Sequence, residues 1–180
     1  MEVSDEELMS LIKAGKIELL NSLFDRYGNR LYSYFLKSTL NKADGDDLTQ
    51  ELFIRVMKYR KSYKEGQSVE IWIFQIARNM VKDHFKKMKV YRDNFCLMEI
   101  IPEHISNEAD NQQEREEQLY RAMSKLSKEK RELLVLSKFE GMKYEQIAIL
   151  RKTSVSNIKV QVHRVIKELK DIYFGQEFEN

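Results

Sequence analysis

Apolar residues recur at steps of three and four along most of this chain, and few residues interrupt them. The 180 residues include one proline and six glycines, so few positions force a helix to end. Leu20, Leu23, Tyr27 and Leu31 illustrate the spacing, which places an apolar stripe along one side of a helix. No segment shows the alternation of a half-buried strand that would compete with this pattern. The sequence therefore predicts an all-α protein.

Four helices joined by short turns are predicted in the first ninety or so residues. Ser4 and Glu7 have the spacing of a capping box, which marks the start of the first helix. Residues 41–45 are expected to form a turn, and Gly66 is expected to interrupt the chain again. The predicted helices cover residues 4–14, 17–38, 46 or 47 onward, and 68–87. Together they would form one compact helical lobe.

The helical pattern fades over residues 90–112, which include the proline, Pro102, and an isolated apolar cluster at 97–101. We expect this segment to be an acidic, flexible linker. It would separate two small helical domains, residues 1–89 and 113–180. Helices in the second domain are expected at about 113–125, 127–140, 143–150 and 154–172.

The small net charge of +2 conceals three strongly charged segments, which alternate in sign along the chain. Residues 82–92 contain five basic residues and one acidic residue, and residues 151–170 contain six and one. Residues 99–117 between them contain seven acidic residues and one basic residue. Two basic patches separated by an acidic strip are typical of polyanion-binding surfaces. Ordinary solvated helix faces are the alternative that charge alone leaves open.

The C-terminal pattern of a short helix, a tight turn and a longer helix capped by Thr153 or Ser154 is typical of a helix-turn-helix. In that motif the second helix enters the major groove of DNA. At 100° per residue, the side of this helix opposite its apolar face collects a mainly polar set, in which Val160 is either a contact for a thymine methyl or a surface valine. Its members are Ser156, Asn157, Val160, His163, Arg164 and Lys167. A generic packing corner between two helices is the competing interpretation of the whole motif.

Two helices of the first lobe carry further candidate sites. The fourth helix places Trp72, Asn79, Lys82 and Lys86 broadly along one face, with Arg78 beside them. An aromatic ring followed by amide and basic groups suits unpaired bases and the strand that carries them. A core tryptophan on an otherwise solvated helix is equally consistent with this spacing.

The third helix is acidic at its start and apolar at close intervals. Phe53 flanks its buried stripe, so part of the ring could remain available for the groove of a partner protein.

Several classes of protein are excluded or disfavoured by composition. Cys96 is the single cysteine, so an intramolecular disulfide or a cysteine-cluster metal site cannot form. No Gly-rich phosphate loop, metal-ligand spacing or Ser/His/Asp grouping indicates an enzyme, and no cofactor or small-molecule substrate is expected. The acidic N-terminus is unlike a signal peptide, and no apolar run is long enough for membrane insertion. We therefore expect a cytoplasmic protein.

Blocks of sequence along the chain resemble the extracytoplasmic-function (ECF) group of bacterial sigma factors, in the sigma-70 superfamily. The matching blocks are DLTQELFIRV at 47–56, WIFQIARNMVKDHFKK at 72–87, YEQIA at 144–148 and SVSNIKVQVHR at 154–164. They occur in the right order and spacing over about residues 10–171. Such a set is far more specific than a lone helix-turn-helix.

This resemblance implies an initiation factor with a region 2-like and a region 4-like domain. Its partners would be promoter DNA and core RNA polymerase, through the β′ clamp and the β flap, and an anti-sigma factor is an open further partner. Residues matching the polymerase-binding helix are Asp47, Gln50, Glu51 and Phe53. Residues matching the part that melts and reads the −10 element are the segment 62–72 and Trp72, Arg78, Asn79, Lys82 and Lys86. Residues matching the −35-reading helix are Ser156, Asn157, Lys159, Val160, His163, Arg164 and Lys167.

The chain departs from the family pattern at the turn of the helix-turn-helix. Lys152 occupies the usual glycine position, Arg151 precedes it where leucine is common, and Thr153 replaces an aliphatic residue. These departures predict a looser or differently angled turn. A stand-alone helix-turn-helix regulator and a helical protein-binding adaptor are the alternatives to a sigma factor.

Overall fold

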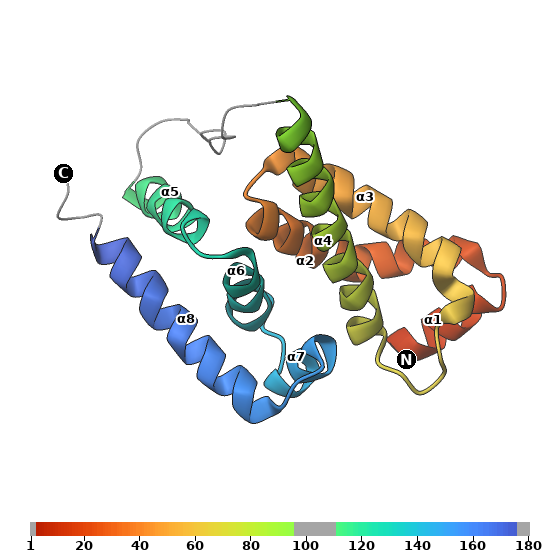
Figure 1. Cartoon of the computed structure of the whole chain (residues 1–180). Coiled ribbons are helices and arrows are strands. Elements are labelled where there is room, and N and C mark those ends of the chain that lie inside the picture. The colour runs from red at the N-terminus through yellow and green to blue at the C-terminus, as the bar shows by residue number, and fades with distance from the viewer. Residues whose placement is uncertain (1–2, 96–110, 176–180) are drawn as a thin grey trace. The chain divides into compact units, whose positions relative to one another are not determined.

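Two compact units, Met1–Met98 and Glu99–Asn180, make up the chain in this computed structural model (Figure 1). Residues 3–95 and 111–175 are described. They contain helices and no strand, which confirms the all-α prediction. Most of the predicted linker lies outside the described residues. Its predicted start at residue 90 falls within a helix that continues to Phe95, while the proposed division into domains stays a prediction.

Over residues 3–95, the first unit has four α-helices and two short 3-10 turns. The capping box predicted at Ser4 is present, because the Ser4 hydroxyl accepts a bond from the Glu7 amide at 3.2 Å and the Glu7 carboxylate accepts one from the Ser4 amide at 3.1 Å. The elements are α1 (Asp5–Lys13), a 3-10 turn (Ile17–Leu19), α2 (Leu20–Thr39), α3 (Lys42–Tyr59), a 3-10 turn (Arg60–Ser62) and α4 (Val69–Phe95).

The turn predicted over residues 41–45 is wrong, because α3 begins four or five residues earlier than expected. Leu40 adopts a left-handed conformation with φ of 60°, and the Asn41 side chain caps the helix by accepting a bond from the Asp44 amide at 3.0 Å. Gly45 lies inside α3, where a Cβ would be 3.3 Å from the Tyr32 ring and 3.4 Å from the backbone of Leu36. This glycine therefore permits a close approach of α2 and α3 instead of a turn.

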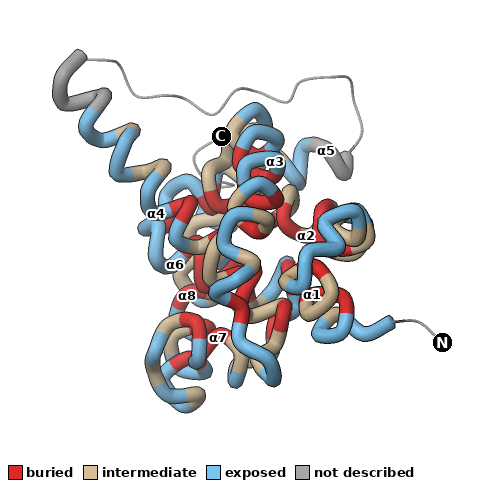
Figure 2. The backbone as a smooth tube through the Cα atoms, turned by 90° about the vertical axis from the view of Figure 1, so that its right-hand side faces the viewer, coloured by how far each residue is buried: buried red, intermediate tan, exposed pale blue. Residues whose placement is uncertain are grey.

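The core of the first unit forms where the apolar stripes of its helices meet, and exposed residues occupy the outer sides of the helices (Figure 2). Residues with no measurable exposure include Met9, Ile12, Leu23, Leu31, Tyr34, Phe35, Leu52, Val56, Ile73, Phe74 and Ala77.

Gly66, with φ of +80°, interrupts the chain before α4, as predicted.

The second unit contains the predicted helix-turn-helix. Its elements are α5 (Asn111–Ser124), α6 (Lys128–Leu134) continuing into a π-helical turn (Val135–Phe139), α7 (Tyr144–Arg151) and α8 (Val155–Gly175). Ser127 caps α6 by accepting a bond from the Lys130 amide at 3.4 Å. Buried apolar residues of α7 and α8 face the rest of this unit, and they include Ile147, Ala148, Leu150, Ile158, Val162 and Val165.

Candidate nucleic-acid interface

The turn between α7 and α8 keeps a tight geometry despite its unusual residues. Lys152 ends α7 with φ of 52° and ψ of 51°, which is the left-handed conformation that glycine adopts most easily. Its amide donates to the carbonyl of Ile149 at 3.2 Å. A looser turn is therefore not observed, since a lysine occupies the conformation usual for glycine, while a differently angled turn stays a prediction.

Lysine in a left-handed conformation is strained, which leads to a stability prediction. Lys152→Gly should raise the free energy of unfolding by about 0.5–1 kcal/mol, because relief of the backbone strain exceeds the added freedom of glycine in the unfolded chain. Thermal unfolding followed by circular dichroism measures the change. Lys159→Gly, at an exposed position within α8, should lower stability instead, and stabilisation by both substitutions would contradict the assignment of strain to Lys152.

Thr153 and Ser154 fix the first turn of α8. The Ser154 hydroxyl accepts a bond from the Asn157 amide at 3.2 Å and thereby caps the helix. The Asn157 side-chain amide donates to the Thr153 hydroxyl at 2.8 Å. The threonine that replaces an aliphatic residue thus orients an exposed asparagine at the start of the helix.

The exposed side of α8 forms a continuous surface, which we call the α8 surface. Ile158, Val162 and Val165 are buried on the opposite side. Val160 is 48% exposed near the middle of the surface. All seven predicted members are exposed, namely Ser156, Asn157, Lys159, Val160, His163, Arg164 and Lys167. The surface combines cations, an amide and an apolar side chain, which are the groups that contact phosphates, adenine edges and thymine methyls.

A second surface runs along α4, and we call it the α4 surface. Asn79, Lys82 and Lys86 are exposed and follow one another at steps of three and four, while Arg78 is half-buried. The Gln75 amide donates to the Asn79 side-chain oxygen at 3.1 Å. This geometry suits contacts with the backbone and bases of a nucleic-acid strand.

Trp72 does not belong to the exposed part of the α4 surface. Its side chain is only 8% exposed, because the ring of Tyr63 packs against it edge-on at 5.6 Å between ring centroids. Of the two interpretations that spacing leaves open, the core tryptophan describes the position of this side chain, and its role at the −10 element stays a prediction. Spacing grouped the indole with the exposed residues of α4 and did not reveal that Tyr63, from the segment before α4, packs against it.

A third surface lies on α3, and it differs from the prediction by one residue. Asp47, Gln50 and Glu51 are exposed, as expected for a partner-binding face. Phe53 is 7% exposed and lies 4.9 Å from the Phe24 ring, so it belongs mainly to the core.

Ile54 is the apolar residue that the sequence interpretation missed. Its side chain is 61% exposed, and it lies seven residues after Asp47 on the same side of α3. Glu51 beside it is oriented by Arg55, whose guanidinium donates two bonds at 2.7 and 3.0 Å. We call Asp47, Gln50, Glu51 and Ile54 the α3 surface.

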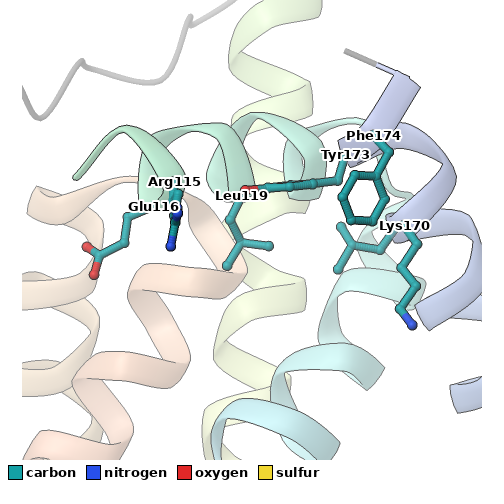
Figure 3. A pocket seen from close by; sticks show the side chains of 7 residues that line it. Arg115, Glu116, Leu119, Lys170, Tyr173 and Phe174 are labelled. Carbon is teal, nitrogen blue, oxygen red and sulfur yellow. The ribbon is translucent and has the colours of Figure 1, made fainter. Parts of the chain in front are cut away.

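A groove of about 390 Å³ lies between α5 and the end of α8 (Figure 3). Leu119, Leu169 and Tyr173 contribute to its mainly apolar lining, which also includes Arg115 and Lys170. It contains no residue of the three surfaces. Within residues 3–95 and 111–175, no cluster of His, Cys, Asp or Glu could hold a metal ion, and no helix is long and apolar enough to cross a membrane.

Comparison with known proteins identifies both units. Residues 23–90 match the family model for sigma-70 region 2, and residues 116–169 match that for sigma-70 region 4. The chain is 27% identical over 172 residues to the RNA polymerase sigma factor CarQ of Myxococcus xanthus, covering 95% of this chain and 98% of CarQ. It is 29% identical over 156 residues to the ECF RNA polymerase sigma factor SigM of Bacillus subtilis, covering 86% and 94%.

Two solved structures share the fold. CnrH, determined in complex with the cytosolic domain of CnrY, matches with a TM-score of 0.73 and 18% identity over 95% of this chain and 97% of CnrH. The sigma factor RpoE of Bartonella quintana, determined with the anti-sigma factor NepR, matches with a TM-score of 0.70 and 20% identity over 84% and 94%. At these identities the matches establish the helical fold.

Proposed function

The chain belongs to the ECF group of RNA polymerase sigma factors, and we propose that it binds core RNA polymerase, recognises −10 and −35 promoter elements, opens the DNA and starts transcription. The observation that carries this proposal is the match of both units, in order, to the two conserved regions of one family. A stand-alone helix-turn-helix regulator would not require the region 2 unit.

The α3 surface is the proposed contact with the polymerase. It combines acidic and amide groups with the exposed Ile54. A helix face of this kind fits a groove that offers an apolar pocket and basic groups at its rim. The β′ clamp is the proposed partner of this surface, and the β flap that of the second unit.

The two basic surfaces are the proposed DNA contacts. The α8 surface would read the −35 element in the major groove, because its polar and cationic residues lie on one side of a helix that follows a tight turn. The α4 surface, together with the segment before it, would bind the −10 element. Opening of the duplex costs a few kcal/mol for each unstacked base, and contacts with the single strand offset that cost.

Further expectations follow from family membership. Sigma factors act by binding, and bond formation belongs to the polymerase. A cytoplasmic location is proposed because the polymerase and the chromosome are found there. An anti-sigma factor is a proposed additional partner, since RpoE of Bartonella quintana was determined in complex with one.

Binding to the polymerase is the first test of this proposal. The full chain should co-elute with bacterial core RNA polymerase on a sizing column, and labelled protein should bind the polymerase tightly enough to survive the separation. Elution as a self-dimer that does not bind the polymerase would favour a stand-alone regulator. Recovery of the chain as a free monomer would contradict the proposal.

A further inference from the structure

The loop that connects the 3-10 turn after α3 to α4 has a buried anchor and an exposed tip. Tyr63 is 1% exposed, whereas the following residues, Lys64, Glu65 and Gly66, are exposed. Gly66 turns the chain with φ of +80°. An exposed tip beside a nearly fully buried tyrosine indicates a loop whose conformation is fixed by the contacts of that tyrosine.

Tyr63 makes three separate contacts that restrain this loop. Its ring packs edge-on against Trp72 at 5.6 Å between centroids. Its hydroxyl donates to the Gln67 carbonyl at 2.5 Å, and so joins the two sides of the tip. Its own carbonyl accepts a bond from Lys13 Nζ at 2.8 Å.

The lysine that holds Tyr63 comes from α1, a helix that is itself fixed to the rest of the unit. The Asp5 carboxylate accepts bonds from Arg26 and Tyr27 of α2, each at 2.5 Å. Burial raises the pKa of the Tyr63 hydroxyl, and the charges of Glu6 and Glu65 raise it further. The hydroxyl therefore stays protonated and remains a donor to Gln67.

We propose that Tyr63 and Lys13 are positioning residues, which hold the tip Lys64–Gly66 ready to contact the unpaired strand of the −10 element. This inference rests on the proposed function. A loop already in its binding conformation does not lose conformational freedom when it binds. Neither residue needs to touch DNA, because both act through the backbone of the loop.

The test compares Tyr63→Phe and Lys13→Met with matched variants. Tyr34→Phe removes a hydroxyl from another buried tyrosine, in α2, and Lys16→Met replaces an exposed lysine three residues after Lys13. Lys13→Arg retains a donor for the Tyr63 carbonyl. Transcription by the reconstituted holoenzyme is measured on one promoter, first fully paired and then with non-complementary strands across the −10 region.

The proposal predicts a loss that is confined to the step of strand opening. Tyr63→Phe and Lys13→Met should each lower transcription from the paired template about three- to tenfold, the factor that one hydrogen bond contributes. Transcription from the pre-opened template and binding to core polymerase should change little, and Lys13→Arg should recover most of the loss.

Two outcomes would overturn the positioning role. In the first, the ratio of transcription from the paired template to transcription from the pre-opened template is the same for Tyr63→Phe as for its control Tyr34→Phe. The same holds for Lys13→Met and its control Lys16→Met. The other is an equal loss on both templates, which would show a general structural effect. If the unmodified protein gives no transcript from either template, the proposed function itself fails, and the inference falls with it.

Discussion

Replacing Ile54 by glutamate should lower the affinity for core RNA polymerase by about 100-fold or more, the scale of a central interface residue. The side chain is 61% exposed, so the folded chain does not depend on its burial. Glutamate also has a helix propensity at least equal to that of isoleucine. The substitution places a third carboxylate beside Asp47 and Glu51 and removes the apolar anchor. Fluorescence anisotropy of the labelled protein with core polymerase measures the affinity.

The matched control for this substitution lies in the other unit. Val160→Glu makes a similar change at a residue that is 48% exposed on α8, and it should leave polymerase binding within about twofold. An Ile54→Glu variant that binds polymerase as tightly as the unmodified protein would show that the α3 surface does not contact the polymerase.

Val160→Glu has a different expected defect, which is the second large effect. Transcription from a promoter that requires its −35 element should fall about 100-fold. The substitution would place a carboxylate in the major groove, between the negatively charged phosphates, and would remove the apolar contact of the valine with a thymine methyl. Start-site-specific primer extension with the reconstituted holoenzyme measures this fall. The melting temperature should stay unchanged.

The promoter itself provides the control for the second effect. With the unmodified protein, a promoter with a scrambled −35 element should give less transcript than the intact promoter. Val160→Glu should reduce transcription from the scrambled promoter by less than about twofold. A similar fractional loss on both promoters would mean that Val160 does not face the −35 element.

The sequence predicted the helical fold well because periodicity and capping are local properties. The capping box at Ser4 and Glu7, the break at Gly66 and the helix-turn-helix were all identified from short patterns. The turn at 41–45 was misjudged because glycine has two roles. Gly45 permits contact between two helices, and only the position of Tyr32 on the neighbouring helix distinguishes that role from a turn.

The candidate surfaces were predicted less accurately than the helices, because the exposure of a side chain depends on tertiary contacts. Every predicted residue of the α8 surface is exposed, because a long helix that covers a small core leaves one full side free. Phe53 and Trp72 lie at the edges of their apolar stripes, where burial depends on Phe24 and Tyr63 from other segments. Periodicity cannot include such partners, so it left the exposure of both rings open and did not single out Ile54.

The central claim is that this chain directs core RNA polymerase to promoters, and reconstituted transcription tests it most directly. Core polymerase is incubated with pooled genomic promoter fragments, with and without the protein, and the 5′ ends of the transcripts are mapped. The account predicts discrete new start sites that require the protein and are lost with Asn79→Ala or Arg164→Ala. No new start sites, together with no stable complex with polymerase, would contradict it and would favour a stand-alone DNA-binding regulator.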